Sequence, residues 1–196
     1  TRPVLVDAGC GFPPVTTAET ARHLPHWRIL GVDPAFAEYV LYDADGHYAC
    51  FDRNGGFQYF QALAAEGGRA LYADPAAARN RFEGLFETLF PLLRKSDGSR
   101  LESAEMDGHK LIHHPIRDFQ TGNLSFFQSD LIDLKHDGAK VIRCMNLLLY
   151  FDPENRKRML RHAGKLLEED GILIVGTNGM GIQTRYAVFK RIAGRL

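Results

Sequence analysis

A glycine turn near the start of the chain carries the residues best suited to bind a ligand. Residues 4–14 read Val-Leu-Val-Asp-Ala-Gly-Cys-Gly-Phe-Pro-Pro, an apolar run that ends in Asp7 and breaks at Gly9 and Gly11. Glycines let the backbone approach a ligand closely, and a helix that follows presents unpaired N–H groups. Thr16 and Glu19 have the spacing of a capping box for that helix. A strand, a glycine turn and a helix in this order predict a cofactor site.

A second acid follows at the spacing typical of a ribose ligand. Residues 27–33 read Trp-Arg-Ile-Leu-Gly-Val-Asp, a short apolar strand that ends in Asp33, 22 positions after Gly11. In dinucleotide sites, an acid about 20 residues beyond the glycine turn binds the ribose diol. A dinucleotide fingerprint also needs a third glycine, whose position is taken here by Pro14. The carboxylate of Asp7, just ahead of the turn, suits a cationic ligand better than a pyrophosphate.

The two acids and the turn together resemble motifs I and II of the class I S-adenosylmethionine-dependent methyltransferases. The resemblance implies that the first acid orients the methionine end of the cofactor, that the turn passes along it, and that the second acid binds the ribose hydroxyls. The cofactor-binding residues implied by these motifs are Asp7, Ala8, Gly9, Cys10, Gly11, Asp33 and Pro34. The family often has a third glycine where this chain has Pro13, so the turn takes a stiffer path. A dinucleotide site and a strand–turn–helix without a ligand are the alternatives.

A third strand is predicted over residues 123–128, Asn-Leu-Ser-Phe-Phe-Gln. In class I methyltransferases a polar residue at the end of the third strand commonly meets the adenine amino group. The resemblance therefore implies cofactor contacts for Ser129, Asp130 and Leu131, with Asp130 facing the adenine. The alternative for Asp130 is to cap a short helical turn from Leu131 to Leu134.

The fourth strand carries a more specific resemblance. Residues 141–151 are apolar at nearly every position, as in a central parallel strand that is covered on both faces. Residues 143–152, Arg-Cys-Met-Asn-Leu-Leu-Leu-Tyr-Phe-Asp, are similar to the fourth strand of the chemotaxis-type glutamate methyltransferases. This similarity implies that Asn146 lies beside the cofactor with Leu147 as its neighbour. Arg143 and Asn146 are not adjacent as they are in that family, so a substrate role for the arginine does not transfer.

A long connection, residues 34–122, separates the second and third strands. Aromatic and β-branched runs at 39–42, 48–51 and 57–60 are divided by the turn candidates Asp45-Gly46 and Asn54-Gly55, which predicts hairpins. A helix is expected over residues 75–94, with Asp74 as its N-cap, and another hairpin around residues 106–108. Connections of this length tend to carry function, so we expect a cap that binds the acceptor. Its predicted acceptor-lining residues are Tyr39, Tyr42, Phe57 and Tyr59.

Composition excludes several classes of protein. The 196 residues are 45% hydrophobic and carry 24 basic and 24 acidic side chains, which indicates one globular domain without the charge excess of a nucleic-acid-binding protein. No apolar run could span a membrane, and no signal-peptide pattern opens the chain. Thr1 already lies at the edge of the first expected strand, so a preceding segment in the natural protein is one expectation. The three cysteines are widely spaced, which indicates neither a zinc ribbon nor a disulfide framework, and we expect a cytoplasmic protein. We expect His109, His113 and His114 to be exposed in a hairpin and to bind no metal.

We therefore expect an α/β doubly wound domain spanning residues 1–196, with a mostly parallel seven-stranded Rossmann-like sheet and a hairpin-plus-helix insertion after strand two. The ligand would lie at the carboxyl ends of strands one to three. The leading hypothesis is an S-adenosylmethionine-dependent methyltransferase that acts on a small molecule. A protein-glutamate carboxyl methyltransferase and a non-catalytic cofactor-binding or interaction module are the alternatives. The sequence identifies neither a catalytic residue, nor the acceptor, nor the oligomeric state.

Overall fold

The chain forms two compact units. The computed structural model describes residues 2–62, 73–93, 101–136, 138–178 and 183–196. The first unit combines Thr1–Pro34 with Ile116–Leu196, and the second unit is Ala35–Pro115. We expected one domain with an insertion over residues 34–122. The second unit lies within that range, but residues 116–122 belong to the first unit, where they lead into its third parallel strand.

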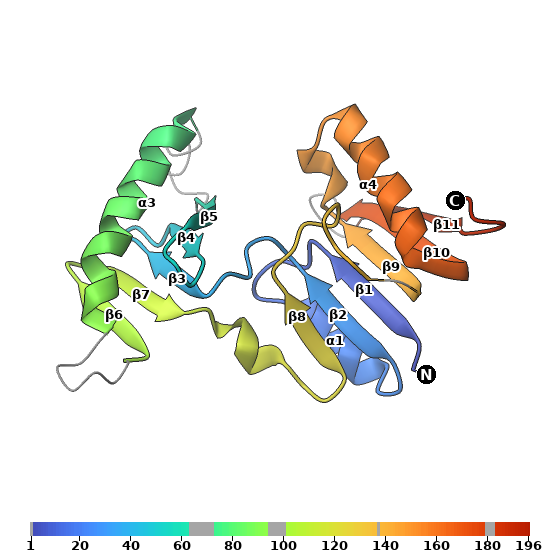
Figure 1. Cartoon of the computed structure of the whole chain (residues 1–196), viewed down its shortest axis with the longest axis horizontal. Coiled ribbons are helices and arrows are strands. Elements are labelled where there is room, and N and C mark those ends of the chain that lie inside the picture. The colour runs from blue at the N-terminus through green and yellow to red at the C-terminus, as the bar shows by residue number, and fades with distance from the viewer. Residues whose placement is uncertain (1, 63–72, 94–100, 137, 179–182) are drawn as a thin grey trace. The chain divides into compact units, whose positions relative to one another are not determined.

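The first unit is built on a six-stranded sheet (Figure 1). Its strands lie in the order β11-β10-β9-β1-β2-β8, and all neighbours are parallel except β10 and β11. The strands are β1 (Val4–Ala8), β2 (Arg28–Val32), β8 (Leu124–Phe127), β9 (Ala139–Met145), β10 (Leu167–Asn178) and β11 (Thr184–Lys190). A mostly parallel sheet is therefore confirmed. The predicted count of seven strands is not, because the described residues supply six, the last of which returns directly from β10 as a hairpin.

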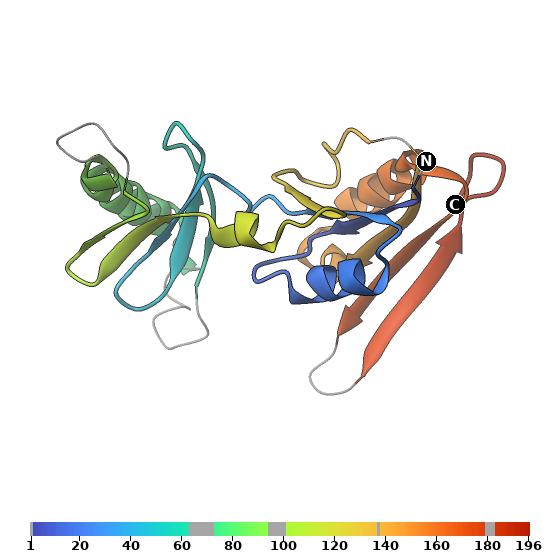
Figure 2. The ribbon, with the colours of Figure 1, turned by 90° about the horizontal axis from the view of Figure 1, so that it is seen from below.

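Helices cover both faces of this sheet, as Figure 2 shows for α1 (Val15–His23) and α4 (Pro153–Leu166). Alternate residues of β1 point to opposite faces. Leu5 belongs to the apolar cluster that contains Ala21 of α1, whereas Val6 belongs to the cluster that contains Met159 of α4. Two 3₁₀ helices, Pro115–Phe119 and Leu148–Tyr150, complete the unit. Among the described residues, no helix is long and apolar enough to cross a membrane.

The strand order reverses at β1. From β1 the chain proceeds through β2 to β8 on one side of the sheet, and then returns to β9 and β10 on the other side. In open α/β sheets, such a reversal leaves a crevice at the carboxyl ends of the strands, because the connections diverge there. The crevice expected here lies beyond the ends of β1 and β9.

Several predicted element boundaries need correction. The capping box at Thr16 and Glu19 is wrong: α1 begins at Val15 behind Pro14 and has no side-chain cap, so Thr16 already lies inside the helix. The fourth strand ends at Met145 instead of residue 151, because Asn146 takes a left-handed φ of +58° that an extended strand does not allow. The apolar spacing of residues 159–167 predicts a helix from Asn155 to Glu168, whereas α4 spans Pro153–Leu166 because Asp152 accepts two backbone hydrogen bonds as its N-cap.

The second unit is an antiparallel sheet packed against one helix. Its strands lie in the order β5-β4-β3-β7-β6. The elements are β3 (Tyr39–Tyr42), β4 (Tyr48–Phe51), β5 (Phe57–Gln61), α3 (Pro75–Leu89), the 3₁₀ helix Phe90–Leu93, β6 (Ser103–Met106) and β7 (His109–His113). The predicted hairpins are confirmed, with Gly46, Gly55 and Gly108 at positive φ in their turns, and Asp74 caps α3 as expected. The predicted helix over 75–94 tightens into a 3₁₀ turn around Pro91, and residue 94 lies outside the described part of the chain.

Candidate functional site

The turn after β1 is built from two left-handed glycines. Gly9 and Gly11 have φ of +68° and +66°, a region that favours glycine. The Gly9 N–H donates to the Val32 carbonyl at 2.8 Å, and the Gly11 N–H donates to Asp33 Oδ2 at 2.9 Å. Both hydrogen bonds hold the turn against the end of β2. A Cβ on Gly9 would lie 2.9 Å from Leu147 Cδ1, so glycine is also required by the close approach of Leu147.

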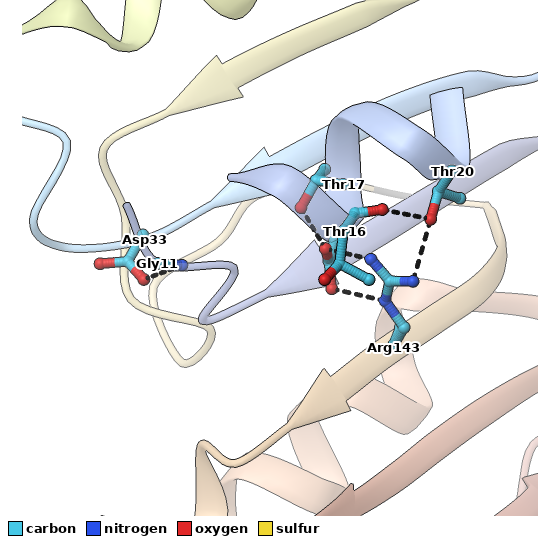
Figure 3. A network of polar contacts seen from close by, with 7 residues as sticks. Gly11, Thr16, Thr17, Thr20, Asp33 and Arg143 are labelled. Carbon is cyan, nitrogen blue, oxygen red and sulfur yellow. Dashed lines mark hydrogen bonds and ion pairs between the residues drawn. The ribbon is translucent and has the colours of Figure 1, made fainter. Parts of the chain in front are cut away.

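Asp7 lies at the centre of a hydrogen-bond network. Figure 3 shows Thr17, Thr20 and Arg143 of this network. Its carboxylate accepts from Arg143 Nε at 2.9 Å and from Arg143 Nη2 at 2.5 Å, and it also accepts from the Thr17 hydroxyl. The two charged residues are register partners on the neighbouring strands β1 and β9. Arg143 donates a further hydrogen bond from Nη1 to Thr20 Oγ1 at 3.0 Å. The network therefore joins β1, β9 and α1 beside the glycine turn.

The ion pair at the centre of this network is largely removed from water. The side chain of Asp7 is 6% exposed and that of Arg143 is 18% exposed. Hydrogen bonding to Asp7 raises the pKa of the Arg143 guanidinium, although burial opposes the shift. Sequence analysis did not assign Arg143 to the site. The signal was a charged residue inside an otherwise apolar strand, since buried arginines almost always have a charged partner.

Two cysteines flank the ion pair. Burial raises the pKa of the Cys10 thiol well above its usual range, and the charges of Asp7 and Asp33 raise it further. Burial raises the pKa of the Cys144 thiol to about 12, with Asp7 again contributing. Both groups are therefore protonated at neutral pH, and neither provides a thiolate nucleophile.

Asn146 is held in a rigid position just past β9. It is one of the few non-glycine residues with positive φ, and its N–H donates to the Gly176 carbonyl at 2.8 Å. Its side-chain Oδ1 accepts from the Asn178 N–H at 2.6 Å. Asn178 Oδ1 in turn accepts from the Thr184 hydroxyl at 3.1 Å. The carboxyl ends of β9 and β10 are thus joined by amide groups that could face a polar ligand.

A cavity of about 410 Å³ opens at this point. Its walls come from the glycine turn, the start of α1 and the ends of β9 and β10. The lining residues are Asp7, Gly9, Cys10, Gly11, Thr16, Arg143, Met145, Asn146 and Asn178. The cavity therefore lies at the sheet position where the strand order reverses, and it exposes both members of the buried ion pair. Two larger depressions, of about 720 and 900 Å³, lie elsewhere on the first unit.

The structure brings part of the predicted cofactor set to this cavity. Asp7, Gly9, Cys10, Gly11 and Asn146 line it, and Leu147 packs beside Gly9. Of the other predicted residues that the structure describes, none lines the cavity; they are Ala8, Asp33, Pro34, Ser129, Asp130 and Leu131.

The residues after β8 have local structural roles. Asp130 Oδ1 accepts from the Ile132 N–H at 3.1 Å, so this carboxylate caps a turn, which was the alternative considered for it. The predicted helical residues 131–134 form a turn and not a helix. Leu131 is buried in the cluster between the sheet and α4. An adenine contact from this segment remains a prediction.

The four aromatic residues predicted to line an acceptor site all lie in the second unit. Tyr39 is 3% exposed and packs edge-on against Phe86 and Phe90, so its ring belongs to the core of that unit. The other three are only partly buried. Tyr42 and Tyr59 each pack against Tyr48, and Phe57 packs against Phe51 and lies 5.5 Å from the Arg79 guanidinium.

One cluster in the second unit has the composition of a metal site. Asp43, Asp45 and His47 place one possible ligand atom each within 4.8 Å of one another, a D-x-D-x-H pattern that sequence analysis passed over. Arg81 Nη2, however, lies 2.8 Å from Asp43 Oδ2 and 3.8 Å from Asp45 Oδ2. Asp43 Oδ1 accepts from the Asp45 and His47 N–H groups. The guanidinium thus supplies the positive charge, and the cluster is explained as the closure of a hairpin turn.

The three histidines singled out from the sequence differ in environment. His109 Nδ1 accepts from the Ala44 N–H at 3.1 Å, and His113 Nδ1 lies 3.5 Å from Glu38 Oε1. The expected exposure is wrong for His114, which is 4% exposed. Burial lowers the pKa of His114 to about 4.

Comparison with known proteins gives only distant likenesses. No family model and no curated protein matches the chain. Among solved structures, an O-methyltransferase family protein from Burkholderia thailandensis is 16% identical at a TM-score of 0.41, and the match covers 91% of this chain and 33% of that one. The mitomycin 7-O-methyltransferase MmcR is 13% identical at a TM-score of 0.41, with coverage of 93% and 33%. PKMT2 from Rickettsia typhi in complex with AdoHcy is 15% identical at a TM-score of 0.42, with coverage of 91% and 22%.

The chain therefore spans about a third or less of the length of these proteins. None of the three is described as a chemotaxis-type enzyme, so the local resemblance of the fourth strand gains no support. With TM-scores of 0.41 to 0.42, these likenesses do not establish a function for this chain.

Proposed function

We propose that the first unit binds S-adenosylmethionine and that the protein transfers its methyl group to a small-molecule acceptor. The observation that carries the proposal is the cavity at the ends of β1 and β9, where Asp7 and Arg143 present opposite charges beside the glycine turn. The amino-acid end of the cofactor is a zwitterion, and a carboxylate next to a guanidinium complements it. The cavity volume of about 410 Å³ lies in the range of small-molecule sites.

Three features of the chain fit the rest of this cofactor. Gly9 lets the backbone approach a ligand where a side chain would collide with Leu147. Asp33, held beside the turn by the Gly11 N–H, is the proposed ligand of the ribose hydroxyls. Asp130, fixed by its turn at the end of the neighbouring strand β8, is the proposed adenine contact.

The cofactor, when bound, supplies a methyl group that is already activated as part of a sulfonium. The chain then has to bind and orient the reactants, and it needs no nucleophile of its own. This fits the protonated state of Cys10 and Cys144. Arg143 lies in the proposed site for the amino-acid end of the cofactor, so a direct role in binding a glutamate side chain of a protein acceptor is not favoured.

The acceptor is proposed to be a small molecule, and the second unit carries aromatic side chains that suit such an acceptor. The half-buried rings of Tyr42, Phe57 and Tyr59 offer apolar surface of the kind that such acceptors need. Tyr39 is removed from this set because its ring fills the core. Tyr59→Ala should lower methyl transfer while leaving cofactor affinity within about threefold of the parent, and a parallel loss of both would contradict the assignment.

Calorimetry with S-adenosylhomocysteine and with NAD tests the cofactor. The main alternative is a dinucleotide, which the proline at the third-glycine position and the carboxylate of Asp7 disfavour. We expect saturable binding of S-adenosylhomocysteine and no response to NAD. Saturable binding of NAD alone would overturn the proposal, and binding of neither would favour a structural role for the turn.

Two variants of Asp33 separate its roles. Asp33→Ala loses both the proposed ribose ligand and the acceptor for the Gly11 N–H, whereas Asp33→Asn keeps an oxygen for Gly11 but loses the charge. Two charge-assisted hydrogen bonds to the ribose are worth about 1.5–3 kcal/mol each, so Asp33→Ala should weaken cofactor binding about a hundredfold or more. Glu168→Ala, at the opposite end of the parallel strands, is the matched control. If Asp33→Ala binds within about threefold of the parent, Asp33 is not the ribose ligand.

A further inference from the structure

Strand β11 is exposed along its whole length. It forms one edge of the six-stranded sheet, as Figure 2 shows, and all seven of its residues are exposed. Three of them are large and apolar: Tyr186 is 67% exposed, Val188 is 53% exposed and Phe189 is 41% exposed. The other edge of the sheet, β8, is only four residues long and includes the buried Leu124. A long apolar edge is the feature that folded proteins usually avoid leaving open.

The edge carries two charged residues, Arg185 and Lys190, but it lacks the backbone devices that prevent strand pairing. Prolines and bulges are the backbone features by which many native edges are blocked. The sequence of β11, Thr-Arg-Tyr-Ala-Val-Phe-Lys, contains no proline. Its ladder to β10 runs through seven residue pairs, from Thr184 to Lys190, without a register shift. The backbone of β11 is therefore straight enough to accept another strand.

We propose that β11 is an interface at which two copies of this chain pair antiparallel, edge to edge, about a two-fold axis at Ala187. A two-fold axis perpendicular to the sheet leaves each residue on the same face of the sheet in both copies. Directly opposite residues must share a face, and side chains alternate along a strand, so the axis has to pass beside a residue that lies opposite its own copy. Centring on Arg185 would place it opposite its own copy, and centring on Val188 would place Arg185 opposite Arg191. Both registers bring like charges together, which destabilises a cross-strand pair.

Centring on Ala187 gives a complementary set of pairs. Tyr186 then lies opposite Val188 of the second copy, and this combination of an aromatic and a β-branched residue is a favoured cross-strand pair. Arg185 lies opposite Phe189, and Lys190 lies opposite Thr184, so no two cations face each other. The symmetry repeats each of these pairs, and two six-stranded sheets become continuous through the shared edge.

The oligomeric state of the purified chain is the first test. Sedimentation equilibrium should show a monomer–dimer equilibrium for the parent protein. Val188→Lys replaces both Tyr–Val pairs with Tyr–Lys pairs and places the two new ammonium groups diagonally across the axis, so we expect dimer dissociation at about tenfold higher concentration or more. Leu92→Lys, a change at an apolar residue of the second unit that is 45% exposed, is the matched control and should leave the equilibrium unchanged. A parent protein that stays monomeric into the high micromolar range overturns the proposal.

A cysteine scan tests the register. In antiparallel sheets, directly opposite residues have Cα atoms about 4.5–5.5 Å apart, a distance that a disulfide can span. Ala187→Cys should therefore cross-link two copies on mild oxidation. Arg185→Cys should not, because the two residues 185 would lie about 13 Å apart along the strands. The parent protein reports any background from Cys10, Cys50 and Cys144. Equal cross-linking of both variants, or efficient linking of Arg185→Cys alone, would refute the proposed pairing, even if the chain dimerises through another surface.

Discussion

Replacing Arg143 with methionine tests whether the ion pair with Asp7 organises the site. Methionine is unbranched like arginine and fills part of the same space, but it removes both hydrogen bonds that the guanidinium donates to Asp7, whose side chain is 6% exposed. Removing one partner of a buried ion pair costs about 3–5 kcal/mol, because the remaining charge is left uncompensated. Arg143 is 18% exposed and Thr17 would still donate to Asp7, so we expect a loss of about 2–4 kcal/mol in the free energy of unfolding.

The single tryptophan makes this loss measurable in the correct unit. Trp27 packs in the apolar cluster between α1 and the sheet, so its fluorescence during urea unfolding reports on the first unit alone. The double variant Asp7→Asn with Arg143→Met removes both charges and should recover part of the loss, with a coupling free energy of about 0.5–3 kcal/mol. Lys157→Met breaks an exposed ion pair with Glu154 in the same unit and should cost less than about 1 kcal/mol.

The same variants separate stability from binding. If the pair also receives the amino-acid end of the cofactor, Arg143→Met should weaken S-adenosylhomocysteine binding about tenfold or more under conditions in which it remains folded. A loss of stability below about 0.5 kcal/mol, or a double variant that shows no coupling, would refute the view that the pair is buried and mutually dependent.

Two further predictions follow from backbone geometry and from burial. Gly9→Ala and Gly11→Ala should each lower the free energy of unfolding by about 1–2 kcal/mol, because both residues have a left-handed φ. Gly9→Ala should cost more, because its Cβ would collide with Leu147, whereas a Cβ on Gly11 has no such neighbour within 4 Å. Urea unfolding followed by Trp27 fluorescence compares the two variants, and equal losses would contradict the close packing at Gly9. The stability of the second unit should fall by up to about 3 kcal/mol as the pH drops from 6.5 to about 4, because His114 binds a proton in the unfolded chain but stays neutral in the folded unit. Circular dichroism in urea at several pH values measures this dependence. It should become weaker in His114→Gln, and an unchanged pH dependence in that variant would contradict the role of His114 burial.

Features that depend on neighbouring residues could be predicted from the sequence. The glycine turn after β1, the hairpin turns at Gly46 and Gly55, and the cap at Asp74 all follow from backbone preferences and short-range hydrogen bonds. Apolar periodicity also located most strands and helices to within a few residues. Predictions failed at boundaries where a single residue departs from the pattern. Asn146, whose positive φ ends β9 early, is the clearest case.

The tertiary structure alone decided which distant residues meet. Asp7 and Arg143 are 136 positions apart, and they become partners only because β9 returns to lie beside β1 in one particular register. In the same way, the pairing of β11 with β10 leaves an apolar edge strand that its sequence does not distinguish from a buried one. Strand order and register depend on the packing of the whole sheet, whereas a local pattern specifies only that a strand exists. The sequence therefore located the glycine turn, and the fold determined the charged partner that lies beside it.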